Sequence, residues 1–182
     1  GEKAPTPEER QRLIDFAKGA EECELELHNS FFKEWKITDP NASSTEEHEA
    51  RQMPNCLLYT SYMKRVVATE SYAQGLAVLL PCFWVYMHVG HVMLRLRESM
   101  GEIPNRKPQY DAWIDMYAGD EFETEVREFI AMVNAECERL QSCEDENTAA
   151  ILKRMEHHFV MGCKLEHMFW DQASTCLQWP KV

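Results

Sequence analysis

The sequence has 182 residues, 45% of them hydrophobic, and its 31 acidic and 19 basic side chains give a formal net charge of -12 at pH 7. A chain of this length builds one hydrophobic core, so we expect a single domain over residues 1–182. The negative charge repels nucleic-acid backbones and anionic membrane surfaces, and the basic residues form no continuous patch, so neither partner is expected.

The seven cysteines are spread along the chain, without the CxxC spacing of a zinc site or the framework of a small secreted protein. Reduced thiols are typical of the cytoplasm, which is the expected location. The sequence shows no signal-peptide pattern, and its most apolar run, around residues 76–89, is broken by Gln74, Pro81 and His88. We therefore expect this run to be too short to span a membrane.

Apolar residues recur at helical spacing along nearly the whole chain, which predicts an all-α fold. The first helix should begin at the segment Thr6–Glu9, because threonine caps a helix, proline fits its first position and acids favour its positive end. It should end near Trp35. Loop residues follow at 39–44, and residues 44–47 could form one turn of helix.

The remaining helices are predicted from the same spacing, with proline or glycine marking several of their ends. Their expected ranges are 56–69 after a restart at Pro54, about 71–99, 108–118, 121–140 and about 147–177, with a loop at 101–108. No internal repeat or low-complexity segment is present, so we expect a compact helical bundle and not a solenoid.

Pro81 should kink the long apolar helix, because proline lacks one backbone donor and presses against the preceding turn. Cys82 follows it directly, and Tyr86 lies four residues later on the same helix face. A thiol and a phenol would thus stand together beside an opened carbonyl group. The alternative is that Cys82 is an inert core thiol and Tyr86 a packed aromatic side chain.

Glu166 lies within the apolar stripe of the last helix, between Cys163 and Phe169. Burial raises the pKa of a carboxyl group toward the range in which it exchanges protons near neutral pH. A thiol on one helix and a buried acid on another are the combination that nucleophilic catalysis requires. The alternative is that Lys164, His167 or a tyrosine simply satisfies the carboxylate.

Two further sets of residues are candidates for binding, one for a small molecule and one for a metal. The six tyrosines suit a flat heteroaromatic ligand, although each one alone is more often part of the packing. No histidine follows a glutamate at the Glu-x-x-His spacing of di-iron bundles. Glu24 with His28, and His88 with His91, are pairs that arise easily by chance, so no metal site is expected.

Five segments in a fixed order resemble motifs of the TenA, or thiaminase II, family. They are Glu24–His28, Tyr59–Met63, Leu79–Tyr86, Tyr110–Tyr117 and Leu165–Ala173. The resemblance extends from about Leu13 to Ala173. It implies a helical fold like that of haem oxygenase, without haem or another cofactor, assembled as a homotetramer. The implied activity is hydrolysis of thiamin or aminomethylpyrimidine to hydroxymethylpyrimidine in thiamin salvage.

By motif position, Cys82 corresponds to the family's nucleophile and Glu166 to its acid/base. Tyr59, Tyr86 and Tyr117 correspond to the wall of the pyrimidine site, and Tyr110 could compete with Tyr117. A free thiol has a pKa of about 8.5 and is mostly protonated at neutral pH. No histidine is spaced to assist it, so proton transfer through Glu166 or the substrate is expected. The cysteine in the Leu-Leu-Pro-Cys segment favours the thiaminase II branch.

One family motif is missing. Family members usually begin with two further helices that carry Gln-Asp-Tyr, whose aspartate holds the pyrimidine, and this tripeptide does not occur here. We expect the native protein to carry such helices upstream, and an open apolar groove beside Cys82 without them. The alternatives to an enzyme of this kind are a non-catalytic pyrimidine-binding or regulatory protein of the same fold, and a metal-dependent oxidase.

Overall fold

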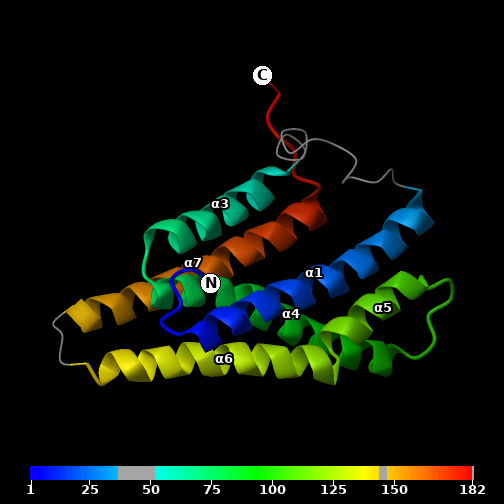
Figure 1. Cartoon of the computed structure of the whole chain (residues 1–182). Helices are drawn as coiled ribbons and strands as arrows, with labels where there is room; N and C mark the ends of the chain where they lie inside the picture. Colours follow the sequence, from blue (N-terminus) through cyan, green and yellow to red (C-terminus); the bar gives the residue numbers. More distant parts are fainter. Residues whose placement is uncertain (37–51, 144–146, 182) are drawn as a thin grey trace. The chain divides into compact units, whose positions relative to one another are not determined.

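The computed structural model of the chain describes residues 1–36, 52–143 and 147–181. These residues form helices joined by turns and loops, which confirms the all-α class. The helices are α1 (Pro7–Trp35), α3 (Pro54–Thr69), α4 (Tyr72–Met100), α5 (Pro108–Tyr117), α6 (Asp120–Gln141) and α7 (Asn147–Thr175) (Figure 1). The expected ends agree with these bounds to within two residues. The expectations for residues 39–47 concern a segment outside the described residues.

The start of α1 forms for the reasons that its sequence indicates. The Thr6 side chain accepts a hydrogen bond from the backbone N–H of Glu9 at 3.2 Å, and Pro7 takes the first helical position. At the other end, Lys36 adopts a left-handed conformation with φ of 55°, which stops the helix. The predicted cap is therefore confirmed.

The chain divides into two compact units, each made of two stretches of sequence. The first unit combines Gly1–Ala42 with Tyr86–Arg127, and the second combines Ser43–Val85 with Glu128–Val182. The boundaries between them fall inside α4 and α6. The expectation of a single domain stays a prediction, and each unit is described by itself.

In the first unit, α1 packs against α5, and the second half of α4 meets the end of α5 very closely. A Cβ atom added to Gly90 would lie 2.6 Å from the carbonyl carbon of Tyr117, so only glycine permits this approach. Arg97 of α4 adds two ion pairs to α5, at 3.0 Å to Asp111 and 2.6 Å to Asp115. These contacts hold Tyr117 at a defined place beside α4.

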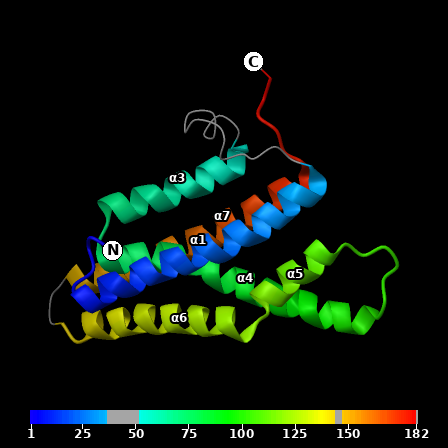
Figure 2. The same ribbon diagram turned by 45° about the vertical axis from the view of Figure 1, so that its right-hand side comes forward.

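In the second unit, α3 and α7 run side by side in both views (Figures 1 and 2). At one end of this pair, the backbone N–H of Asn55 donates to Gln172 Oε1 at 2.7 Å, and its side-chain amide donates to the carbonyl of Met168 at 2.8 Å. The two helices are antiparallel, because residues early in α3 contact residues late in α7.

The long helix α4 differs from its expectation in one respect. It continues through Gln74, Pro81 and His88 as one helix of 29 residues, and by length and composition alone it is apolar enough to cross a membrane. The prediction that the apolar run is too short to span a membrane was therefore wrong, because the whole helix that contains the run, and not residues 76–89 alone, has the necessary length and hydropathy. The same test is passed by core helices of soluble proteins, so the absence of a membrane partner stays a prediction.

Candidate active site

Glu166 lies in the core of the second unit. Its residue is 1% exposed, although a charged carboxylate is rarely buried to this extent. Met155 and Leu165 of the same helix are also buried. The expectation that Glu166 occupies a core position on α7 is confirmed.

Two aromatic side chains meet the Glu166 carboxyl group. The indole N–H of Trp170, one turn later on α7, donates to Oε1 at 2.9 Å. The Tyr59 hydroxyl on α3 lies close enough to favour the charged form. The other oxygen, Oε2, is buried and has no partner of full hydrogen-bond geometry among the described residues. Of the partners considered from the sequence, the tyrosine is the one found, while Lys164 and His167 are exposed.

Burial raises the pKa of Glu166 above its ordinary value of 4.5, and the hydrogen bonds of Tyr59 and Trp170 only partly oppose this. The raised pKa brings the protonated and ionised forms closer in population near neutral pH. A carboxyl group in this state can both give and accept a proton. The surroundings of Glu166 thus support the proton exchange that was predicted from its place in the apolar stripe of the last helix.

The first half of α4 runs parallel to α7, because later residues of α4 contact later residues of α7. Gln74 Oε1 of α4 lies 3.2 Å from His158 Nε2 of α7. Two turns later on α4, Pro81 lies against Gly162, where an added Cβ would be only 2.8 Å from Pro81 Cγ. The two helices therefore approach each other closely at Pro81 and Gly162.

The predicted nucleophile stands beside this close approach. Cys82 follows Pro81 directly, is half-buried and is not part of a disulfide, and Glu166 lies one turn beyond Gly162 on α7. One helical turn advances about 5.4 Å along the axis. Because both helices run the same way here, the thiol and the carboxyl group belong to the same stretch of the α4–α7 contact.

The other two predicted tyrosines lie in the first unit, within an aromatic cluster. The ring centroid of Tyr117 lies 4.9 Å from that of Tyr86 and 4.7 Å from that of Trp113, and Phe122 meets it edge-on at 5.1 Å. Tyr117 is 4% exposed, and its hydroxyl donates to Glu24 Oε1 of α1 at 3.2 Å. The rings are tilted or edge-on to one another, an arrangement that aromatic pairs favour and that fixes the position of each ring.

Cys82, Glu166 and Tyr59 thus lie in the second unit, and Tyr86 and Tyr117 lie in the first. The expectation that all five serve one site stays a prediction. Tyr110, the competitor of Tyr117, is 56% exposed and borders a separate, largely apolar cavity of about 280 Å³ between α4 and α5.

Sequence reasoning missed three residues at these places. Trp113 and Trp170 lie four residues from Tyr117 and Glu166, so helical spacing could have found both. Glu24 was considered only as a weak metal ligand. Its contact with Tyr117 joins residues 93 positions apart in sequence, and no local pattern signals such a contact.

Two of the residues named as weak metal ligands, Glu24 and His91, have other partners. Glu24 accepts a hydrogen bond from Tyr117, and His91 Nε2 lies 3.1 Å from Glu123 Oε2. Within residues 1–36, 52–143 and 147–181, no group of three or more His, Cys, Asp or Glu side chains could hold a metal ion.

Comparison with known proteins gives a consistent result. A family model described as the TENA/THI-4/PQQC family matches residues 1–176. The chain is 31% identical over 163 residues to the aminopyrimidine aminohydrolase of Bacillus subtilis (strain 168), which covers 89% of this chain and 61% of that protein. It is 32% identical over 157 residues to the aminopyrimidine aminohydrolase of Halalkalibacterium halodurans, covering 86% and 62%.

A third relative combines several activities in one chain. The thiamine biosynthesis multifunctional protein ThiED of Corynebacterium glutamicum is 27% identical over 164 residues, which cover 88% of this chain and 18% of that protein. The chain spans about three fifths of the length of the two aminohydrolases.

Proposed function

Because the chain belongs to the TENA/THI-4/PQQC family, we propose that it hydrolyses aminopyrimidines in thiamin salvage. The substrate would be thiamin or aminomethylpyrimidine, and the product hydroxymethylpyrimidine. The observation that carries this proposal is the buried Glu166 on α7, with its raised pKa, beside the α4 segment that bears Cys82. Relatives that are named aminopyrimidine aminohydrolase support the same substrate class.

In the proposed reaction, the Cys82 thiol gives its proton to the Glu166 carboxylate, and its sulfur bonds to a carbon of the electron-poor pyrimidine ring, which opens one double bond of the ring. The protonated Glu166 carboxyl group gives its proton to the departing amine, and the exocyclic C–N bond breaks. Water then adds to the methylene carbon and gives a proton to the Glu166 carboxylate. Finally the C–S bond breaks, which releases hydroxymethylpyrimidine, and the sulfur takes its proton back from Glu166. The cysteine in the Leu-Leu-Pro-Cys segment favours the thiaminase II branch.

The tyrosines would bind and orient the ring. Burial raises the pKa of the Glu166 carboxyl group, and Tyr59 stands beside this group and favours its charged form, which partly offsets the effect of burial. Tyr86 and Tyr117 would belong to the aromatic wall of the pyrimidine site, and Tyr117 suits this role better than Tyr110, because it is buried in the aromatic cluster. The Glu24 carboxylate at the Tyr117 hydroxyl is a candidate acceptor for the substrate's amino group.

We also propose that the enzyme acts as a homotetramer in the cytoplasm, without a nucleic-acid or membrane partner. The seven cysteines all lie within the described residues and none of them is in a disulfide, which suits a reducing compartment. Sedimentation velocity of the purified protein tests the tetramer directly.

The activity is tested by incubating the purified protein with thiamin or aminomethylpyrimidine and following the release of hydroxymethylpyrimidine by chromatography. Cys82→Ser should abolish release, because a hydroxyl group is a far poorer nucleophile than a thiolate and occupies a similar volume. Cys56→Ser is the matched control, since Cys56 is also half-buried and not part of a disulfide. It should keep the wild-type rate.

Two results would contradict the proposal in different ways. Activity of Cys82→Ser above about a tenth of the wild-type rate would exclude the covalent step. Binding of the pyrimidine by the wild-type protein without any release would identify a non-catalytic binding protein instead.

A further inference from the structure

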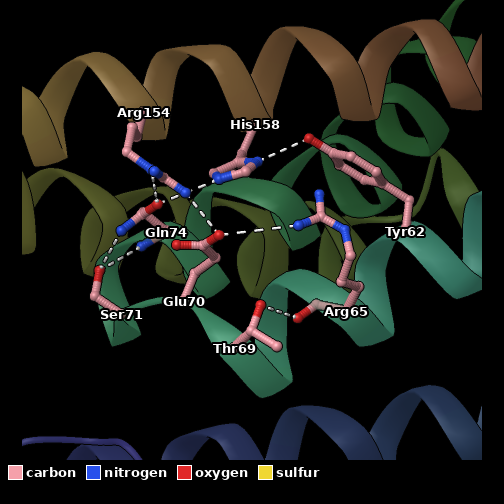
Figure 3. A network of polar contacts seen from close by, with 8 residues as sticks. All are labelled: Tyr62, Arg65, Thr69, Glu70, Ser71, Gln74, Arg154 and His158. Carbon is pink, nitrogen blue, oxygen red and sulfur yellow. Dashed lines mark hydrogen bonds and ion pairs between the residues drawn. The ribbon is translucent and has the colours of Figure 1, made fainter.

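A second group of polar side chains lies in the same unit as Glu166 and takes no part in the proposed chemistry. We call it the His158 cluster, and Figure 3 shows its members: Tyr62, Arg65, Thr69, Glu70, Ser71, Gln74, Arg154 and His158. His158 is 3% exposed and Gln74 5% exposed, so both are as deeply buried as the apolar core. Buried polar groups of this kind are costly unless they are fully hydrogen-bonded.

His158 joins α7 to two other helices. Its Nδ1 atom lies 2.8 Å from the Tyr62 hydroxyl of α3, and its Nε2 atom lies 3.2 Å from Gln74 Oε1 of α4. Arg154, one turn earlier on α7, donates from Nε to the same Gln74 oxygen at 2.9 Å. Its Nη2 atom pairs with Glu70 Oε1 at 2.6 Å, at the end of α3.

The donors and acceptors of these bonds follow from the arginine. Arg154 can only donate, so the Gln74 atom that it meets is the oxygen, and His158 Nε2 must also donate to that oxygen. In neutral histidine Nδ1 is then an acceptor, and the Tyr62 hydroxyl donates to it. The Gln74 amide nitrogen donates onward to Ser71 Oγ at 3.0 Å. Each link therefore has a defined direction.

The charge state of His158 agrees with this pattern. Burial lowers the pKa of His158 below its ordinary value of 6.5, and the neighbouring His157, Arg154 and Arg65 lower it further, while Glu70 acts in the opposite sense. The imidazole is consequently neutral at neutral pH. A proton on Nδ1 would remove the acceptor that Tyr62 uses.

The His158 cluster and Glu166 lie on one stripe of α7. His158, Gly162 and Glu166 follow one another at intervals of four residues, so His158 lies two turns, or about 12 Å, from the acid along the helix. On the facing helix α3, Tyr62 lies three residues after Tyr59. Because the two helices are antiparallel, Tyr62 contacts His158 and Tyr59 contacts Glu166, at neighbouring positions along the helix pair.

Glu166 is bracketed by polar links between α3 and α7. On one side are the hydrogen bonds of Asn55 to Gln172 and to the Met168 carbonyl, and on the other is the bond between Tyr62 and His158. Hydrogen bonds depend steeply on distance and angle, so a small axial shift of α7 breaks them, whereas apolar contacts tolerate it better.

We propose that His158 is a positioning residue for Glu166: by tying α7 to Tyr62 of α3 and Gln74 of α4, it fixes the register in which the Glu166 carboxyl group meets Tyr59. Its catalytic meaning rests on the proposed function, but the positioning itself does not. A misplacement of about 1 Å at a reacting group can lower a rate roughly a hundredfold, so a link two turns away matters for the chemistry.

The test follows Glu166 directly, through the indole N–H of Trp170 that donates to it. Its nitrogen–proton NMR signal is assigned by its loss in Trp170→Phe, and its shift is then recorded as a function of pH. We expect Tyr62→Phe and His158→Leu to move both the signal and its titration midpoint. His157→Leu is the control: His157 is exposed and meets the His158 ring edge-on, but it makes none of the hydrogen bonds from His158 to α3 and α4, so its loss should change neither.

The conservative variant His158→Asn distinguishes the loss of the hydrogen bond to Tyr62 from the loss of side-chain volume. In His158→Asn the side-chain oxygen can accept from Tyr62 in place of Nδ1, so the Trp170 signal should return toward its wild-type position. If His158→Leu does not fold, Tyr62→Phe decides the matter, since it keeps the ring and removes one hydroxyl. An unchanged Trp170 signal and midpoint in folded Tyr62→Phe would overturn the proposal.

Kinetics form a second readout where the wild-type protein turns over aminopyrimidine. Tyr62→Phe should lower kcat roughly ten- to hundredfold with KM within about twofold, and should shift the limb of the pH–rate profile that belongs to Glu166. A variant that only loses stability would keep kcat and the profile. If the wild-type protein releases no product, the proposed function fails, while the Trp170 signal still decides the positioning.

Discussion

Gly162→Ala tests a close contact of the second unit. The added methyl group would lie 2.8 Å from Pro81 Cγ and 3.3 Å from the Val78 carbonyl oxygen. Carbon atoms in favourable contact are about 3.5–4.0 Å apart, so α7 and α4 must separate by roughly 1 Å, or the Pro81 ring must shift. Because Cys82 and Glu166 flank this contact, the separation should also slow any reaction that needs both.

Two opposing terms set the size of the effect on stability. Overpacking by one methyl group costs about 1–3 kcal/mol of unfolding free energy. Replacing glycine by alanine inside a helix stabilises it by about 1 kcal/mol. Gly75→Ala, on α4, supplies the second term alone, since its added methyl would lie 3.9 Å from the nearest atom, Val67 Cγ2. The difference between the two variants therefore isolates the clash, at about 1–3 kcal/mol.

Urea denaturation followed by circular dichroism measures both variants at neutral pH. We expect Gly75→Ala to be at least as stable as the wild-type protein, and Gly162→Ala to unfold at a lower urea concentration than Gly75→Ala. Equal midpoints for the two variants would refute the reasoning, because they would show that α4 and α7 adjust to the methyl group freely. The rate of hydroxymethylpyrimidine release, measured on the same samples, should fall only in Gly162→Ala.

Glu166→Gln should lower kcat by about two to four orders of magnitude with little change in affinity. The raised pKa means that Glu166 binds a proton more tightly in the folded protein than in the unfolded chain, so its contribution to stability falls as pH rises from 4.5 through the folded pKa. Urea unfolding at neutral pH should therefore show Glu166→Gln to be more stable than the wild-type protein. A less stable Glu166→Gln would contradict a raised pKa. For His158 the pKa is lowered, so the pH dependence is the opposite: its contribution to stability is complete above pH 6.5 and is lost as pH falls from 6.5 toward the folded pKa. Urea denaturation of His158→Asn over the same pH range should show a weaker dependence of stability on pH. Tyr117→Phe should raise KM, because it removes the hydroxyl group that donates to Glu24. Tyr110→Phe, at an exposed position, should leave KM unchanged. Equal KM values for the two variants would show that Tyr117 does not bind the substrate.

Local sequence signals determined the helices and the burial of the acid. Thr6, Pro54 and Pro108 lie where helices begin, and Glu166 lies on a stripe whose other members are apolar. Such signals succeed because capping, proline geometry and helical spacing depend on residues within one or two turns of each other. The family motifs are likewise contiguous segments, so they could be identified without knowing how the helices pack.

Tertiary structure alone decided which side chains face one another across helices. His158 meets Tyr62, 96 positions earlier in the sequence, and Tyr117 meets Glu24 across 93 positions. Gln74 was expected to interrupt an apolar run, yet it is buried, because Arg154 and His158 donate to its oxygen. Helical periodicity reports which face of a helix is apolar but not which helix covers it or in what register. The surroundings of Glu166 could therefore be read only after α3, α4 and α7 had been brought together.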